Sequence, residues 1–214
     1  VQTCALPILY VGDSEGKIWE FGAGLGQGGV LYDVGPTPEG HTQPIGAPLA
    51  LYRDRDNGHL MVAAVTGGTD WAAPSDTYSV YVIDVDAIDS QRGQRGVLRF
   101  QTPIKGRGYA APVVSGYDLY VTGSEGLMGQ SSGALRGSLG DAGTMQRINL
   151  QSGQVTQSVA TQKTAGSVQI AADGRLVIPT VGQVQLSTVD GGDTRGGGLW
   201  ERQRLASRLW LQSY

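Results

Sequence analysis

Residues 10–16 read YVGDSEG, and residues 120–126, 110 positions further on, read YVTGSEG, with five of the seven positions identical. The segment VTGG at residues 65–68 lies halfway between these copies, and LVI at residues 176–178 follows the second copy. The valines at positions 11, 65, 121 and 177 are therefore spaced by 54, 56 and 56 residues. A fixed spacing of this kind indicates four copies of one structural unit.

Each unit contains short segments with the features of β-strands. Turn signals precede three of the repeated segments, at residues 56–58 (DNG), 115–116 (SG) and 173–174 (DG), and glycine in such steps provides the positive φ angle of a tight hairpin. Alternating polarity is typical of a half-buried strand. We predict the repeated strands over 60–66, 118–122 and 175–179, and the strands that follow over 17–21, 78–85, 145–150 and 183–189. Ala47-Pro48 and Ala111-Pro112 open the hairpins of the second and third units.

About four strands per unit, repeated at this period, are typical of a β-propeller. We therefore expect an all-β fold, an incomplete β-propeller of about four four-stranded blades over residues 9–189. The expected blades cover residues 9–44, 45–108, 109–165 and 166–189. Propellers often close with more than four blades, so we expect the C-terminal part of a larger ring. Gly123–Gly143 is expected to be a long loop, 190–198 a Gly-rich linker, and 199–214 a C-terminal tail that fits helix and strand equally.

The composition argues against several classes of protein. Glycine and proline, 34 and 9 of 214 residues, are too abundant for a helical bundle, while 40% hydrophobic residues supply a core. The net charge of −3 provides no basic face for nucleic acid. No apolar run approaches the roughly 18 residues of a membrane helix, so we predict no transmembrane segment in this sequence. The two histidines, His41 and His59, lie in polar turn sequence, where we expect surface residues.

Residues 1–8 read VQTCALPI, which is the translation of GTT CAG ACG TGT GCT CTT CCG ATC, the end of a common short-read sequencing adapter. Our hypothesis is that these residues do not belong to the natural protein and should be left out of fold reasoning. They include Cys4, the one cysteine of the chain. The natural part would then contain no cysteine and depend on packing alone, and the sequence would begin within a domain, so we expect a signal peptide to lie outside it.

Residues 10–21, YVGDSEGKIWEF, resemble the Ala-Gly-Asp-x-x-Gly-x-Leu-Trp-Arg-Phe signature of PilY-type pilus-tip adhesins. The segments QPIGAP (43–48), GHLMV (58–62), TGGTDW (66–71) and YVIDVD (81–86) resemble the next blade of that family. RINLQSGQV (147–155) is similar to a repeat of quinoprotein-like propellers, and the tail resembles the end of the family domain. Within these segments, Trp19 is expected in the blade core.

This resemblance implies the quinoprotein-like propeller of a protein of type IV pili, exported to the periplasm, outer membrane, cell surface or pilus, or secreted. It implies a non-enzymatic role in pilus assembly, adhesion and twitching motility, with pilin, minor pilins and host or abiotic surfaces as partners. Two alternatives stay open: a quinone-dependent dehydrogenase, and a periplasmic propeller scaffold of outer-membrane assembly. The sequence lacks the vicinal cysteine pair of the quinoproteins, and a shared fold does not carry chemistry with it.

No catalytic or cofactor-binding residue is predicted. The metal candidates are Asp54, Asp56 and Asn57, because calcium prefers clustered carboxylate and amide oxygens. An EF-type loop starting at Asp54 would need glycine at its sixth position and an acid at its twelfth, but His59 and Val65 stand there. A solvated hairpin turn is the alternative, and the family's calcium loop is expected upstream of this sequence. Asp70 and Trp71, in a segment after a strand, are the candidates for partner binding.

Overall fold

The computed structural model describes residues 8–22, 28–69, 72–73, 75–90, 94–125, 142–164, 166–180 and 183–188. This part of the chain is all-β, with fourteen strands and no helix. It contains no helix long and apolar enough to span a membrane. The predicted linker at 190–198, the tail at 199–214 and most of the proposed adapter segment lie outside the described residues.

The strands form four antiparallel sheets, which we number in chain order. Each sheet consists of strands that follow one another in the sequence. Sheet 1 contains β1 (Leu9–Gly12), β2 (Lys17–Phe21) and β3 (Gly28–Asp33); sheet 2 contains β4 (Ala50–Arg53), β5 (Leu60–Val65), β6 (Ser79–Asp89) and β7 (Gln94–Pro103). Sheet 3 contains β8 (Val113–Ser115), β9 (Asp118–Ser124), β10 (Ala142–Asn149) and β11 (Val155–Gln162); sheet 4 contains β12 (Gln169–Ile170), β13 (Arg175–Thr180) and β14 (Gln183–Thr188).

The predicted strands are confirmed within two or three residues at most ends, because the turns that separate them were recognisable. Gly58, Gly116 and Gly174 all have positive φ, as the turn signals require. The predicted loop at 123–143 is two residues too long at each end, since β9 extends to Ser124 and β10 starts at Ala142. Backbone pairing of Gly143 with Ser124 extends the hairpin there.

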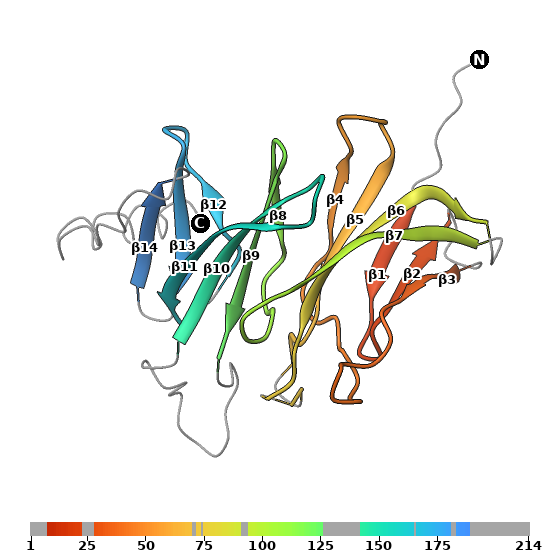
Figure 1. Ribbon diagram of the computed structural model, residues 1–214, viewed down its shortest axis with the longest axis horizontal. Coiled ribbons are helices and arrows are strands. Elements are labelled where there is room, and N and C mark those ends of the chain that lie inside the picture. The colour runs from red at the N-terminus through yellow and green to blue at the C-terminus, as the bar shows by residue number, and fades with distance from the viewer. Residues whose placement is uncertain are drawn as a thin grey trace, which may run out of the picture.

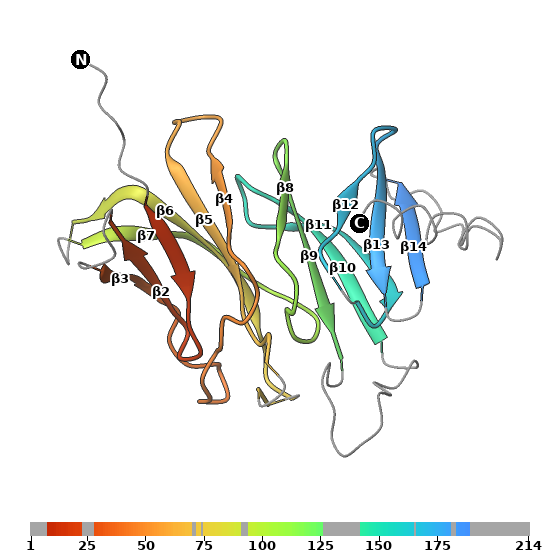
Figure 2. The same cartoon turned by 180° about the vertical axis from the view of Figure 1, so that it is seen from behind.

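The four sheets stand in a row in chain order, and neighbouring sheets face one another (Figures 1 and 2). Three apolar clusters fill the interfaces between them. The first joins sheets 1 and 2 and includes Ile18, Val62 and Ile83; the second joins sheets 2 and 3 and includes Val65, Val82 and Val121; the third joins sheets 3 and 4 and includes Met145, Leu176 and Ile178. Sheet 2 is therefore buried on both faces, which explains why β5 is a continuous apolar run.

In the structure, equivalent positions of sheets 2, 3 and 4 are 57 residues apart, one more than the spacing of 56 between the valines at 65, 121 and 177. We call the face of a sheet that points to the next sheet its forward face, and the opposite face its rear face. Val65 lies on the forward face of sheet 2, whereas Val121 lies on the rear face of sheet 3, in the same cluster. The position equivalent to Val121 is therefore Ala64 in sheet 2 and Ile178 in sheet 4, both on rear faces, at a spacing of 57.

The connections between sheets repeat as well. The segment that leads into each new sheet binds a carbonyl at the end of the preceding repeated strand. Ile45 N donates to Asp13 O at 2.9 Å, and Gly108 N donates to Thr66 O at 3.0 Å. At the third junction Thr164 Oγ1 donates to Gly123 O at 3.4 Å. The first two junctions thus share a backbone hydrogen bond, and at the third a threonine side chain takes the place of the backbone donor.

Candidate functional site

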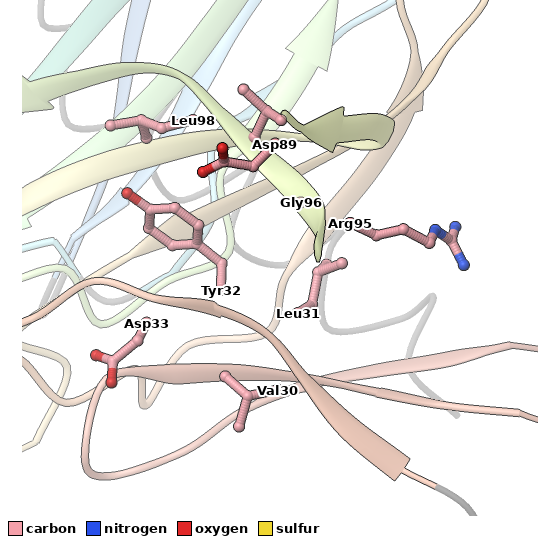
Figure 3. Close-up of a pocket in the computed structure, with 9 residues that line it drawn as sticks. Val30, Leu31, Tyr32, Asp33, Asp89, Arg95, Gly96 and Leu98 are labelled. Atoms are coloured by element: carbon pink, nitrogen blue, oxygen red, sulfur yellow. The ribbon is translucent and has the colours of Figure 1, made fainter. Parts of the chain in front are cut away.

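A groove with ionisable side chains in its lining lies between β3 and β7, at the boundary of sheets 1 and 2 (Figure 3). Its volume is about 360 Å³, within the usual range of ligand sites. Residues 30–33 line it from β3, residues 95–98 line it from β7, and Asp89 lines it from the end of β6. The two strands that form its walls are edge strands of their sheets in the described part of the chain.

A glycine allows β3 and β7 to approach. Gly96 has φ +91, and a Cβ atom there would collide with the carbonyl oxygen of Leu31. Leu31 is itself buried in the cluster between sheets 1 and 2, so it fixes the floor of the groove. The groove therefore depends on a position where the backbone of one sheet touches the backbone of the next.

The charged side chains of the groove differ in direction and in charge. Arg95 extends away from the other lining residues (Figure 3), and its Nη1 donates to Glu20 Oε1 at 2.9 Å. Its Nε donates to Val85 O at 3.2 Å, so the guanidinium is anchored outside the groove. Asp33 and Asp89 are the acidic residues of the lining, and Asp33 Oδ1 accepts a hydrogen bond from Gly35 N at 2.9 Å. Tyr32 rises from β3 toward Asp89 and Leu98.

The nine residues that line the groove can offer a ligand hydrogen bonds, ion pairs and apolar contacts. Val30 and Leu98 are exposed at the groove. Edge strands also present backbone N–H and C=O groups that an extended peptide can pair with. Sequence reasoning missed this site because its residues come from two units and form no motif. Gly96, within the segment QRGVLRF (94–100), is the local feature that could have signalled a close backbone approach.

The metal candidates lie in a turn beside a second, smaller hollow of about 90 Å³ between sheets 2 and 3. Asp54 Oδ1 accepts a hydrogen bond from Asp56 N at 2.9 Å, and Asn57 Oδ1 accepts one from His59 N at 2.9 Å. Asp56 Oδ2 accepts a hydrogen bond from Gln151 Nε2 at 2.8 Å. The carboxylates thus serve as hydrogen-bond acceptors that join the turn to sheet 3.

Among the described residues, no group of three or more His, Cys, Asp or Glu side chains is placed to hold a metal ion. Asp70 and Trp71, the partner-binding candidates, lie outside the described residues. Their role stays a prediction, as does that of the Asp54 turn in calcium binding.

Both histidines are at the surface, as predicted, but each also contacts a buried carboxylate. Nδ1 of His41 lies 2.9 Å from Asp76 Oδ2, and Nδ1 of His59 lies 2.9 Å from Asp84 Oδ2. Asp76 also accepts a hydrogen bond from Thr37 Oγ1 at 2.9 Å. The two histidines therefore cover buried aspartates, Asp76 before β6 and Asp84 within β6, and the lining of the groove includes neither histidine.

The aspartate of the resembling signature has a structural role. Asp13 Oδ1 accepts hydrogen bonds from the backbone N–H groups of Glu15 and Lys17, both at 2.8 Å. Burial alone would raise the pKa of Asp13, but the bond from the Trp19 side chain and these backbone bonds together lower the pKa below its ordinary value. The aspartate of this signature thus stabilises the tight turn between β1 and β2.

Trp19 differs from its prediction. Ile18 is fully buried between sheets 1 and 2, while Trp19 is half-buried on the rear face of sheet 1. The reason is the period of two along β2, which sends neighbouring side chains to opposite faces. The expectation that Trp19 belongs to the blade core is therefore wrong in the described structure.

These features define an all-β protein of serially stacked antiparallel sheets with a groove between the first two sheets. No family model matches the chain, and no curated protein matches it.

Proposed function

We propose that the four sheets are consecutive blades of a quinoprotein-like β-propeller. The observation that supports this fold is the serial face-to-face packing of antiparallel sheets, with equivalent positions 57 residues apart in sheets 2, 3 and 4. In a propeller each blade buries its two faces against its neighbours, as sheets 2 and 3 do here.

We further propose that the chain is a non-enzymatic binding module of a PilY-type protein of type IV pili, exported from the cytoplasm and acting at the cell surface. Its partners are pilin or minor pilins, and a host or abiotic surface. Support comes from the segment YVGDSEGKIWEF, which forms the β1–β2 hairpin, and from the groove next to it between β3 and β7. The groove is suited to an extended segment with apolar and basic side chains, because it combines edge strands, exposed Leu98 and two carboxylates.

The pilus role can be tested by deleting the gene in a type IV-piliated bacterium that encodes this chain. We expect loss of surface pili and of twitching, restored by the intact gene. Unchanged piliation and twitching would overturn the proposal. Quinone absorbance with dye-linked alcohol oxidation would instead favour a dehydrogenase.

The groove can be tested with the purified chain and immobilised pilin or minor pilins. Leu98→Asp should weaken binding at least tenfold, because it places a charge at the apolar wall of the groove. Leu51→Asp is the matched control, since Leu51 is also an exposed leucine of sheet 2 but does not line the groove. Equal affinity of the two variants would exclude the groove as the binding site.

A further inference from the structure

The hollow between sheets 2 and 3 brings together arginine side chains from separate strands. It lies where the β4–β5, β8–β9 and β10–β11 turns meet, at one end of the two sheets (Figures 1 and 2). Its charged lining consists of the three arginines Arg53, Arg55 and Arg99 and the two aspartates Asp54 and Asp56. The lining therefore carries one positive charge in excess, and this charge favours an anion over the cation that the sequence of the turn suggests.

Two of the arginines keep their hydrogen-bond donors. Arg53 Nη1 donates to Gly58 O at 2.9 Å, within its own hairpin. Arg99 Nη2, in contrast, lies 4.0 Å from Asp54 Oδ2, which is beyond hydrogen-bond distance. The Cζ atom of Arg55 lies 5.4 Å from the centroid of the Tyr117 ring, over its face. Within the described part of the chain, neither Arg55 nor Arg99 donates a side-chain hydrogen bond.

The backbone of β7 is irregular at Arg99. Val82 pairs with Phe100 and Ile83 pairs with Leu98, so Arg99 stands opposite no residue of β6. A β-bulge of this kind redirects the side chain of its extra residue, and bulges are common next to active sites. The bulge thus accompanies the position of Arg99 in the lining of the hollow.

Tyr52 adds a neutral donor to the lining. It is half-buried and packs against the apolar cluster between sheets 2 and 3. Burial raises the pKa of its hydroxyl above the ordinary value, so the hydroxyl keeps its proton at neutral pH. Among the described residues, this hydroxyl has no hydrogen-bond partner.

Hydrogen bonds hold the three turns in place around the hollow. Leu150 N donates to Tyr117 O at 2.8 Å and joins the β10–β11 turn to the β8–β9 turn. Gln151 Nε2 donates to Asp56 Oδ2 at 2.8 Å and joins the β10–β11 turn to the β4–β5 turn. A site whose parts are fixed in this way pays less conformational entropy when a ligand binds.

We propose that this hollow binds a carboxylate group, with the guanidinium groups of Arg55 and Arg99 and the hydroxyl of Tyr52 as donors. Guanidinium groups bind carboxylates through parallel N–H donors. The volume of about 90 Å³ suits a single small group, and the rest of the ligand would lie over Tyr117, which is 41% exposed. One negative charge balances the excess charge of the lining, whereas a phosphate group carries more than one.

The experiment is an NMR titration of the isotope-labelled whole chain with sodium acetate at constant ionic strength. We expect saturable shifts at the residues of the hollow, with a dissociation constant in the millimolar range, since so small a ligand makes few contacts. Arg99→Gln should weaken binding at least about tenfold, because it removes a hydrogen bond to a charged group. Arg175→Gln is the control: it removes the same charge from a side chain of similar exposure, 51% against 44% for Arg99, outside the hollow.

Two capped tripeptides, Gly-Glu-Gly and Gly-Gln-Gly, identify the source of the carboxylate. Binding of the glutamate peptide and not of the glutamine peptide would assign the site to an acidic side chain of a protein. Binding of acetate and of neither peptide would assign it to a free small carboxylic acid.

Three results would overturn the proposal: no saturable shift with acetate, tighter binding of phosphate than of acetate, or equal loss of affinity in Arg99→Gln and Arg175→Gln. Far-UV circular dichroism establishes that the variants keep their β-structure. Arg99→Lys, which keeps the charge but not the guanidinium fork, replaces Arg99→Gln if that variant unfolds, and it should also weaken binding. The site depends on neither the propeller fold nor the pilus role, which the gene deletion tests separately.

Discussion

The indole Nε1 of Trp19 donates a 2.7 Å hydrogen bond to Oδ2 of Asp13, across the turn that joins β1 to β2. The other carboxylate oxygen accepts two backbone hydrogen bonds within the same turn. One side chain therefore sets both the turn and the orientation of the aromatic ring on the rear face of sheet 1.

Asp13→Ala should lower the free energy of unfolding by about 1–3 kcal/mol, because three donors lose a charged acceptor. Chemical denaturation followed by circular dichroism measures this loss. Glu15→Ala is the control in the same turn: its carboxylate pairs with Lys17 at the surface, and exposed pairs of this kind contribute little to stability. Equal losses in the two variants would contradict the role given to Asp13.

The stability supplied by Asp13 should depend on pH. Its pKa is lowered in the folded protein, so the ionised form stabilises the fold. This contribution is complete above the ordinary Asp pKa of about 3.9 and is lost as the pH falls through the lower folded value. The difference in unfolding free energy between wild type and Asp13→Asn should therefore be constant near neutral pH and shrink below about pH 4. A difference that grows in acid would contradict this assignment.

Gly96→Ala should destabilise the junction of sheets 1 and 2. Gly96 has positive φ, which costs an alanine about 1–2 kcal/mol, and its Cβ would also meet the backbone of Leu31. The collision should add roughly 1–3 kcal/mol. Gly35→Ala separates the two effects, since Gly35 has φ +72 but open space around it. Thermal or chemical unfolding of both variants measures the difference, and similar losses would show that the approach of β3 and β7 is not constrained.

Gln43→Ala should lower the free energy of unfolding by about 1–3 kcal/mol. The buried amide Nε2 of Gln43 donates to the Tyr81 hydroxyl at 2.9 Å and to Pro36 O at 3.0 Å, and its Oε1 accepts from Thr66 Oγ1 at 3.0 Å. Gln154→Ala, at an exposed position of a turn, should change stability by no more than roughly 0.5 kcal/mol. Denaturant titrations of both variants test whether this network stabilises the junction.

The sequence predicts the strands of this protein well, because its hairpins are local. Asp173-Gly174 marks a turn, and the predicted strand 175–179 after it lies within β13, Arg175–Thr180. The predicted number of four strands per sheet is confirmed only in part. Sheets 2 and 3 have four strands, and the described parts of sheets 1 and 4 have three.

Contacts between units were harder to predict. The spacing of valines placed Val65 and Val121 in equivalent strands, but the period of two in a strand turns a one-residue offset into a change of face. The groove between β3 and β7 was not predicted at all, because it depends on how two sheets meet. The turn at residues 54–58 was recognisable from the sequence. The hydrogen bond between Asp56 in this turn and Gln151 was not, because the two residues are 95 positions apart in the chain.

The double burial of sheet 2 has a consequence for local opening of the structure. Residues 61–65 of β5 are at most 1% exposed, so their amides exchange with solvent only when both neighbouring sheets separate. In an isolated chain, sheets 1 and 4 each have one described neighbour and should exchange faster. Amide hydrogen exchange should therefore be slowest in β5 and β6 and become faster toward both ends of the row.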